Sequence, residues 1–254
     1  SPSLRLTAEG QTYLMAADGQ RMAGPLGGTL PESFLTQIRF REVTIDPEGL
    51  FQEPVRFSDG ALDLRLRLNP FSVEIGQLSL AEAAQRLTAT GRVGADAKGW
   101  SAAVDLRLNQ IAHDRLVALW PVTLLPRTGD WVAKNILKGK LFDVEAALRI
   151  NPGQEPRLHL GYSFEQTEVR FIPTLPPIHD GYGYSTIDGL VYTVVLSRGR
   201  VPPPEGGQID VSGSVMRVPD ITQKPARGEI TLTTQSSLTA ALSLLDQPPF
   251  TFMT

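Results

Sequence analysis

Cysteine is absent from this chain of 254 residues, which excludes disulfide bonds and thiol chemistry. Long apolar runs are absent too: none reaches the ~18 residues of a membrane-spanning helix, and the N-terminus lacks a basic segment followed by an apolar one. The net charge of −3 at pH 7 and the scarcity of clustered lysine and arginine argue against nucleic-acid binding. With 41% hydrophobic residues, the chain can build one large all-β domain or two smaller ones.

Residues that usually form catalytic and metal sites occur singly here. The three histidines, His113, His159 and His179, lie far apart in the sequence, and none has the spacing of a metal-binding motif. The nucleophile elbow, the P-loop and the dinucleotide-binding glycine motif are all missing. We interpret the neighbouring residues His179 and Asp180, which precede Gly181, as turn chemistry. We therefore expect a protein that is not an enzyme and that holds no metal and no cofactor.

Most of the chain alternates between apolar and polar residues, which is the pattern of an antiparallel sheet with one apolar face. Residues 62–68 are the clearest case, with four leucines on one face and Asp63, Arg65 and Arg67 on the other. Turn signals such as Asn69-Pro70 separate the segments. Similar alternation runs through residues 71–75, 87–93, 102–108, 142–150, 158–164, 190–196, 209–215 and 230–232. About ten to twelve strands are predicted.

A helical segment at residues 116–139 interrupts the strands. The pattern predicts a helix over residues 128–138, with Thr128 as its N-cap and Gly139 as its left-handed end. A shorter helix from Arg115 to Trp120 is expected to stop at Pro121. The apolar residues of this helical plug are Trp120, Trp131, Val132 and Ile136. We interpret the plug as a cap packed on the sheet, with a gate or docking element as the alternative.

These elements divide the chain into three parts: an N-terminal β segment (1–112), a helical insert (113–140) and a C-terminal β segment (141–254), which alternatively form one continuous domain. The last part is predicted to carry a terminal helix capped by Ser236 or Ser237. In total, two or three short helices are expected. They are too few to cover the apolar face of about ten strands.

Two fold solutions follow for this mostly β chain. Either a curved antiparallel sheet lines an apolar, taco-like groove, or two sheets pack as a filled sandwich. The inward-facing residues are mainly aliphatic, which suits acyl chains because these need apolar contact and little directional bonding. The candidate lining residues are Leu64, Leu66, Val73, Val104, Leu148, Leu160, Val194 and Val211. Periodicity alone does not separate a lipid-lining face from a sandwich core.

The chain resembles the DUF3971 domain of the AsmA-like/YhdP-like family of large bacterial envelope proteins, over residues 60–254. The motifs that carry the resemblance are Leu119-Trp120-Pro121, Arg127 with Trp131-Val132 and Asn135, residues 171–177, Leu242 with Leu245-Asp246 and Pro248-Pro249, and Gly91-Arg92-Val93 with Gly99-Trp100. The resemblance implies a β-groove in a periplasm-spanning protein that moves phospholipid from the inner to the outer membrane. It supplies no catalytic residues.

Under that resemblance, the chain is expected to be a periplasmic section of a lipid conduit. Its partners are then phospholipid acyl chains, the remaining part of the same long chain, and the inner membrane through an anchor outside this sequence; nucleic acid is not a partner. The alternative is a structural or assembly module that serves outer-membrane biogenesis through protein contacts. A hydrolytic or glycan-processing role would need convergent polar groups that the sequence does not indicate.

Overall fold

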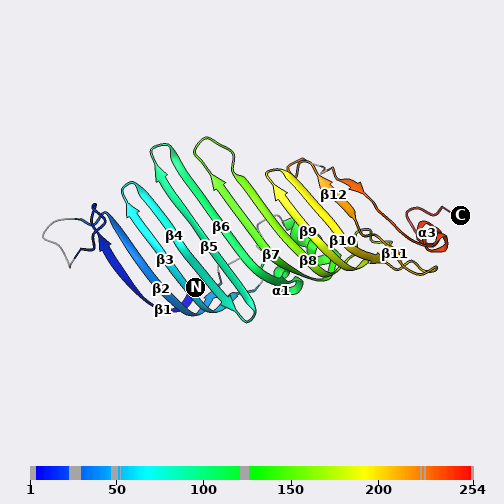
Figure 1. The fold of residues 1–254 in the computed structure, drawn as a ribbon, viewed down its shortest axis with the longest axis horizontal. Coiled ribbons are helices and arrows are strands. Elements are labelled where there is room, and N and C mark those ends of the chain that lie inside the picture. Colours follow the sequence, from blue (N-terminus) through cyan, green and yellow to red (C-terminus); the bar gives the residue numbers. More distant parts are fainter. Residues whose placement is uncertain are drawn as a thin grey trace. The chain divides into compact units, whose positions relative to one another are not determined.

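The computed structural model describes residues 4–22, 30–46, 51, 53–120, 126–223, 225 and 227–252. Their strands form a 13-stranded sheet, in which β1 to β10 follow one another in chain order, β12 and β13 come next, and β11 pairs with β10 (Figure 1). The sheet is antiparallel and is not closed into a barrel. The predicted mostly β fold with a curved antiparallel sheet is therefore confirmed. The described strands form no second, facing sheet, so the sandwich alternative is not found among them.

The early strands are β1 (Leu4–Met15), β2 (Ser33–Ile45), β3 (Val55–Leu68), β4 (Phe71–Glu82), β5 (Gln85–Asp96) and β6 (Gly99–Ala112). The later ones are β7 (Ile136–Ile150), β8 (Arg157–Val169), β9 (Ile178–Asp188), β10 (Val191–Val201), β11 (Ile209–Asp210), β12 (Ser214–Val218) and β13 (Glu229–Thr231). The described helices are α1 (His113–Ala118), α2 (Pro126–Asn135) and α3 (Leu238–Leu245). None of these helices is long and apolar enough to cross a membrane.

The chain forms two compact units. The first contains Ser1–Glu48, Glu53–Asn109 and Glu145–His159, and the second contains Gly49–Gln52, Gln110–Val144 and Leu160–Thr254. The change of unit after Asn109 lies close to the predicted end of the N-terminal β segment at residue 112. Residues 145–159 belong to the first unit, although the sequence-based division places them in the C-terminal segment.

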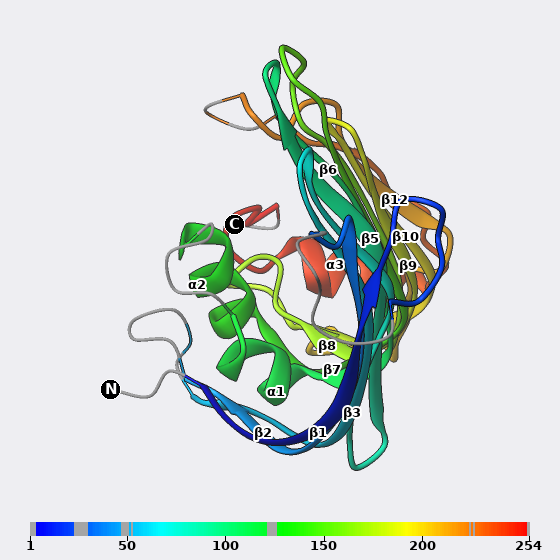
Figure 2. The same cartoon turned by 90° about the vertical axis from the view of Figure 1, so that its left-hand side faces the viewer.

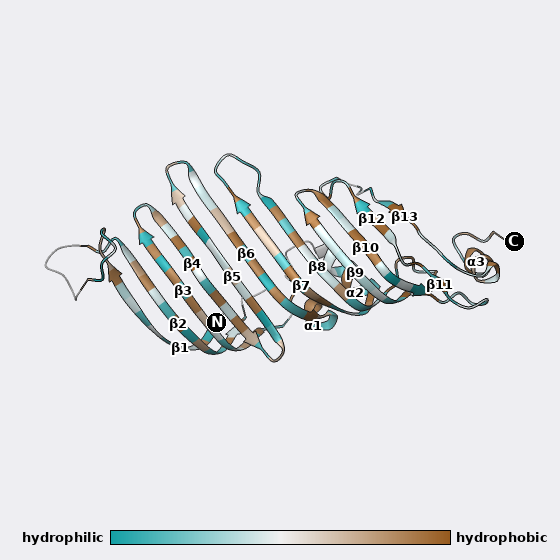
Figure 3. Cartoon of the chain, viewed as in Figure 1, coloured by the Kyte–Doolittle hydropathy of each residue, from teal (hydrophilic) through white to brown (hydrophobic). Residues whose placement is uncertain are grey.

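Strands β1 to β6 of the first unit form a meander in which each strand pairs antiparallel with the next. Strands β1, β2 and β3 are visibly bent (Figure 2). Leu64 lies opposite Ile75, and Leu66 lies opposite Val73. Because directly opposed residues of paired strands point to the same side, this register gathers the leucines of β3 and their partners on one face. Hydrophobic and hydrophilic residues alternate along these strands in Figure 3.

The second unit has a small closed core at the end of the chain. Val201, Ile209 and Val211 pack with Ala240 of α3, and the partly buried residues Ile178, Leu196 and Leu244 pack against this cluster. The predicted terminal helix is confirmed as α3. Its N-cap is Ser237, whose hydroxyl accepts a hydrogen bond of 3.1 Å from the backbone N–H of Ala240.

The predicted boundaries of the central helix are wrong at both ends. Helix α2 begins at Pro126, two residues before the expected cap Thr128, and ends at Asn135. The Asn135 carbonyl accepts a hydrogen bond of 2.8 Å from the N–H of Arg170, which follows β8, and the chain continues directly into β7. Ile136 is therefore the first residue of a strand and does not belong to the helical plug.

Gly139 lies within β7 and does not end a helix. A Cβ atom at this position would come 3.0 Å from Oγ1 of Thr167, so the glycine allows a close approach of the neighbouring strand. The shorter helix α1 covers His113–Ala118, somewhat earlier than the predicted segment from Arg115 to Trp120. Pro121, its predicted stop, lies outside the described residues.

Strand β7 has an irregular backbone position at Asp143. Asp143 has a positive φ of 49°, and Phe142 before it stacks on Tyr182 with ring centroids 6.3 Å apart. Glu165 forms an ion pair of 2.8 Å with Lys140, which lies two residues before Phe142 in the same strand. Phe142 therefore lies on the face of Lys140.

Strand β9 contains residues that the sequence pattern assigns to a turn. His179, Asp180 and Gly181 all lie within β9, so their interpretation as turn chemistry is wrong. A Cβ at Gly181 would lie 3.0 Å from the carbonyl oxygen of Thr167, and a Cβ at Gly183 would collide with the carbonyl oxygen of Val195. These glycines therefore serve close strand packing, which hides the usual signature of a strand.

Candidate functional site

The first unit carries a broad aliphatic surface, which we name the apolar face. Its members are identified by the cross-strand register. They are Leu62, Leu64, Leu66, Val73, Ile75, Leu78, Leu80, Leu87, Val93, Val104, Leu106 and Leu108. Val73 lies opposite Val93, and Gly91, two residues before Val93, lies opposite Val104. The predicted lining residues Leu64, Leu66, Val73 and Val104 are thus brought onto one side of the sheet.

Leu148 is placed on the same face by two ion pairs. Asp105 bonds Arg149 at 2.6 Å, and Arg107 bonds Glu145 at 3.1 Å. Asp105 and Arg107 point to the side opposite Val104, because side chains alternate along β6. Leu148 alternates with its neighbour Arg149 and therefore joins Val104, with 36% of its surface exposed.

The side opposite the apolar face is the charged face. Arg149 also donates a hydrogen bond of 2.9 Å to the Val104 carbonyl, which fixes its guanidinium over the strand. A shallow depression on this face is lined partly by Thr88, Thr90 and His159, together with Asp105, Arg107 and Glu145. Its acidic and basic groups pair with one another, so the depression presents no unpaired set of charges of one sign.

The apolar face is incompletely buried. Among its members only Leu80 belongs to the buried hydrophobic residues, whereas Leu64, Leu66, Val73 and Val104 keep intermediate exposure. An aliphatic sheet face that packs against a second layer would lose nearly all contact with water. The described residues therefore leave this surface accessible to an apolar ligand.

Two aromatic residues that sequence reasoning did not assign to the site lie at the turn end of the apolar face. Phe71 and Trp100 meet edge to face, with ring centroids 5.9 Å apart, and Trp100 is 61% exposed. Ala95 lies opposite both residues, on β4 and β6 respectively, so they share the face of Val73 and Val104. The period-2 spacing from Trp100 to Ala102 and Val104 was a signal that could have identified them.

The predicted lining residues of the second unit fall into two groups. Leu160 and Val194 are half-buried. They share one face, because Tyr162 and Tyr192, each two residues away, join their hydroxyls at 3.2 Å. Burial raises the pKa of Tyr162 above the usual range of a phenol, and Tyr192 adds to the increase, so this phenol stays neutral.

Val211 has different surroundings. It is only 6% exposed and belongs to the closed core with Ala240 of α3. The prediction that Val211 lines an accessible surface is wrong, because α3, which follows in the sequence, covers this end of the unit.

The helical-plug residues also lie in the second unit. The ring of Trp120 packs next to Gly129. A Cβ atom added at Gly129 would come 2.7 Å from the indole Nε1 of Trp120. Trp131 is 41% exposed and meets Phe171 edge to face at 6.3 Å. The carbonyl oxygen of Val132 lies 3.3 Å from Nε2 of His113. Three of the four predicted plug residues are thus tied to α1, α2 and the loop after β8, while Ile136 lies in β7.

No family model, no curated protein and no solved structure matches this chain. The resemblance to AsmA-like envelope proteins stays a prediction. The function of the chain is therefore inferred from its own geometry.

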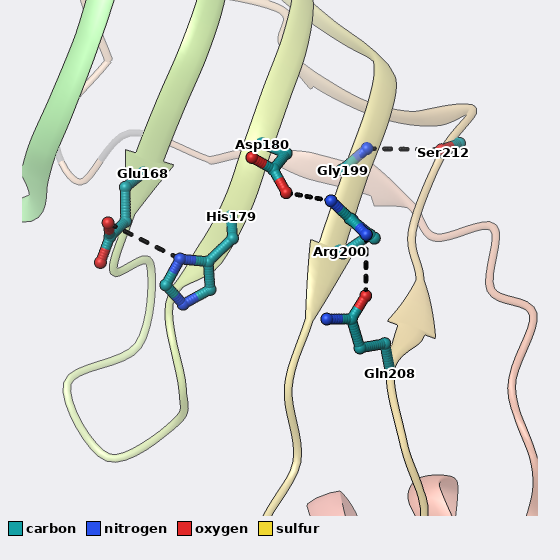
Figure 4. A network of polar contacts seen from close by, with 7 residues as sticks. All are labelled: Glu168, His179, Asp180, Gly199, Arg200, Gln208 and Ser212. Atoms are coloured by element: carbon teal, nitrogen blue, oxygen red, sulfur yellow. Dashed lines mark hydrogen bonds and ion pairs between the residues drawn. The ribbon is translucent and has the colours of Figure 1, made fainter.

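A polar network joins one end of β8, β9 and β10 in the second unit (Figure 4). Nδ1 of His179 lies 3.6 Å from a carboxylate oxygen of Glu168, and Arg200 is ion-paired with Asp180. Arg200 also donates a hydrogen bond of 3.1 Å to Gln208. The groups satisfy one another across neighbouring strands, which identifies the network as a clamp between strands. Among the described residues, no group of three or more His, Asp or Glu is arranged to hold a metal ion.

Proposed function

We propose that this protein binds phospholipid acyl chains on the apolar face of its first unit. The observation that carries the proposal is the register of β3 to β6, which aligns aliphatic side chains on one side while leaving them partly exposed. Burying apolar surface contributes about 0.8 kcal/mol per CH₂ group, so an acyl chain lying along several strands gains affinity without specific hydrogen bonds.

The composition of the apolar face favours an acyl chain over a protein partner. Protein interfaces draw most of their binding energy from tyrosine, tryptophan and arginine. The members of the apolar face are leucine, valine and isoleucine; Phe71 and Trp100 lie at its turn end, and Phe34 and Phe40 of β2 lie on the same side of the sheet. Arg65 of β3 and Asp105 and Arg107 of β6 form their ion pairs on the charged face. Acyl chains match such a surface because they require apolar contact alone.

The mechanism that follows is physical and involves no covalent chemistry. Acyl chains lie against the aliphatic side chains and move along them, because no directional bond fixes their position. Head groups remain in water at the ends of the strands, since burying a charged phosphate without a partner is costly. Trp100 suits such a boundary, because its indole has an apolar body and a polar N–H.

The resemblance to AsmA-like proteins supplies the setting of the proposal. The chain would be one section of a periplasm-spanning conduit that carries phospholipid between the inner and outer membranes. The remainder of the same long chain and an inner-membrane anchor outside this sequence would be its further partners. Each unit would contribute apolar surface, through Leu64, Leu66, Val73, Val104 and Leu148 in the first and through Leu160 and Val194 in the second.

The test is native mass spectrometry of protein purified from a bacterial envelope, followed by extraction and identification of the bound lipid. We expect co-purified phospholipid, and we expect Val104→Asp to reduce it at least about tenfold, because a carboxylate on the apolar face is poorly solvated beside an acyl chain. Ala103→Asp is the matched control. Ala103 is the preceding residue of β6, is exposed and points to the opposite face, so this variant should retain lipid.

Circular dichroism shows whether both variants keep the strand content of the parent protein. A parent protein that carries no lipid and takes up no fluorescent phospholipid from vesicles would overturn the proposal. That result would favour the alternative, an assembly module that acts through protein contacts. Equal lipid loss in Val104→Asp and Ala103→Asp would equally contradict the assigned face.

A further inference from the structure

The outer edge of β1 is a long stretch of strand with few protective features. The strand has 12 residues, and its first nine are exposed. Sheet edges are usually protected by proline, lysine, bulges or a covering segment. The described part of β1 contains no proline and no lysine, and the register irregularity between Arg5 and Thr7 places the extra residue on β2. Strand β1 therefore offers a regular template for another strand.

The hydrogen bonds near Met15 show which backbone groups face this open edge. The N–H of Met22 donates to the Leu14 carbonyl at 2.9 Å, from the side of the strand away from β2. The Met15 carbonyl accepts instead from Glu32, which precedes β2. Because backbone groups alternate in direction along a strand, the even-numbered residues from Leu4 to Thr12 point their N–H and C=O groups outward.

The same hydrogen bonds limit the open stretch. Arg21 forms a bridge to Met15, so the returning chain covers the end of β1. Within the described residues, no strand other than β2 pairs with residues 4–13. An added strand must therefore pair with the N-terminal part of β1.

Two charges in this part define a self-complementary pattern. Arg5 and Glu9 are the charged residues of β1, and both point to the side opposite Ala8. Neither forms an ion pair within the described residues, although Arg39 of β2 lies opposite Glu9. In an antiparallel pair of identical strands centred on Thr7, Arg5 of each copy lies opposite Glu9 of the other.

We infer that β1 pairs antiparallel with β1 of a second copy of this chain, in the register centred on Thr7. This register brings outward-facing residues together, since Leu6 lies opposite Ala8 and Leu4 lies opposite Gly10, and each such pair exchanges backbone hydrogen bonds. Pairing centred on Glu9 would oppose two carboxylates, and pairing centred on Arg5 would oppose two guanidinium groups. Like charges directly opposite each other destabilise a sheet, so these registers are disfavoured.

The inferred dimer also has a definite relation to the apolar face. A two-fold axis normal to the sheet relates the antiparallel copies, so the same face of each copy points to the same side. Ala8 lies opposite Phe40 of β2, and Phe40 lies opposite Gly60 of β3, two residues before Leu62 of the apolar face. The apolar faces of both copies therefore lie on one side of the joined sheet. This inference is independent of lipid binding, and its test uses no lipid.

The first test is a charge exchange followed by sedimentation equilibrium. The parent protein is expected to dimerise, and Arg5→Glu alone or Glu9→Arg alone should each raise the dimer dissociation constant at least about tenfold, since each creates two like-charge contacts by symmetry. The double variant Arg5→Glu/Glu9→Arg restores both pairs in exchanged positions and should dimerise like the parent. A monomeric parent protein, or single variants that dimerise unchanged, would overturn the inference.

The second test uses the absence of cysteine from the chain. Thr7→Cys should give a disulfide-linked dimer under mild oxidation, because residues at the centre of the pairing have Cα atoms about 4.5 Å apart, within disulfide range. Gln11→Cys is the matched control on the same face of β1. Its two copies would lie about 27 Å apart in this register and should stay unlinked. Cross-linking of Gln11→Cys in place of Thr7→Cys would show a different register and refute the inference.

Discussion

Ile75 and Ile209 are both strand isoleucines that alternate with polar neighbours, yet their environments differ. Ile75 lies on the apolar face of the first unit and keeps intermediate exposure. Ile209 of the second unit is only 3% exposed, because it packs in the cluster that contains Ala240 of α3. Alternation therefore defines an apolar side, whereas a covering element decides whether that side becomes a core or a binding surface.

The largest effect is expected when the same truncation is made in both regions. Ile209→Ala should lower the free energy of unfolding by about 2–5 kcal/mol, because it leaves a cavity in a closed core. Ile75→Ala should cost about 1 kcal/mol, since the side chain is only partly removed from water. Urea denaturation followed by circular dichroism measures both. Equal losses would show that the two faces are buried to the same degree.

Two glycine substitutions, one in each unit, test how much room the sheet leaves for an added methyl group. Gly183→Ala should destabilise the second unit by about 1–3 kcal/mol, because the new methyl group meets the Val195 carbonyl oxygen and lies 2.8 Å from the ring of Phe164. Gly76→Ala in β4 is the matched control. The nearest atom to its Cβ would be 3.7 Å away, so the expected change is below about 0.5 kcal/mol. A Gly183→Ala protein as stable as the parent would contradict the close packing of β9 against β10 and β8.

Weakening α3 should expose the closed core of the second unit to water, as the apolar face of the first unit is exposed. Ser237→Ala removes the N-cap of α3 and is expected to cost about 1 kcal/mol. The variant should also speed hydrogen exchange of the α3 amides, as measured by mass spectrometry. Ser236→Ala, one residue earlier, leaves the cap in place and should behave like the parent. If both variants exchange equally fast, Ser237 does not hold the helix end.

The smallest effect concerns pH at the closed end of the second unit. Hydrogen bonds from the hydroxyl and the backbone N–H of Ser212 lower the pKa of Asp210. A carboxyl whose pKa is lower in the folded state stabilises the protein above its ordinary pKa, and this contribution is lost as the pH falls through the lowered value. Asp210→Asn should therefore be less stable than the parent at neutral pH, with the difference shrinking in acid.

Thermal melts at a series of pH values measure this difference. Ser212→Ala removes the hydroxyl donor but retains the backbone N–H. This variant should therefore lose only some of the pH-dependent stability that Asp210 contributes. A constant difference between parent and Asp210→Asn from neutral to acidic pH would contradict the assignment.

Local periodicity was sufficient to predict the apolar face of the first unit. Residues 62–68 lie within β3, and the four leucines share one side as predicted. Val104 of β6 and Leu148 of β7 join them, although they are far away in sequence. The prediction succeeded because each strand alternates regularly and pairs with its neighbour in the chain, so that sides assigned strand by strand remain consistent.

The remaining differences come from contacts that a sequence pattern does not contain. The positive φ that Asp143 adopts within β7 has no reliable sequence signal. Val211 became a core residue because α3 covers it, which depends on where the chain returns after β13. Strand β9 was missed since its glycines are required by the close approach of Thr167 and Val195.

The strand order has a consequence for how the protein folds. From β1 to β10, every strand neighbours the strands that precede and follow it in the chain, and short turns join β3 to β6, whereas α1 and α2 lie in the longer connection between β6 and β7. For an all-β protein this gives a low contact order, and we expect hairpins to add one after another with little topological delay. Cooperativity in such a linear array passes between nearest neighbours, as it does in repeat proteins. A destabilising substitution in one strand should therefore unfold the strands beside it before the rest of the sheet.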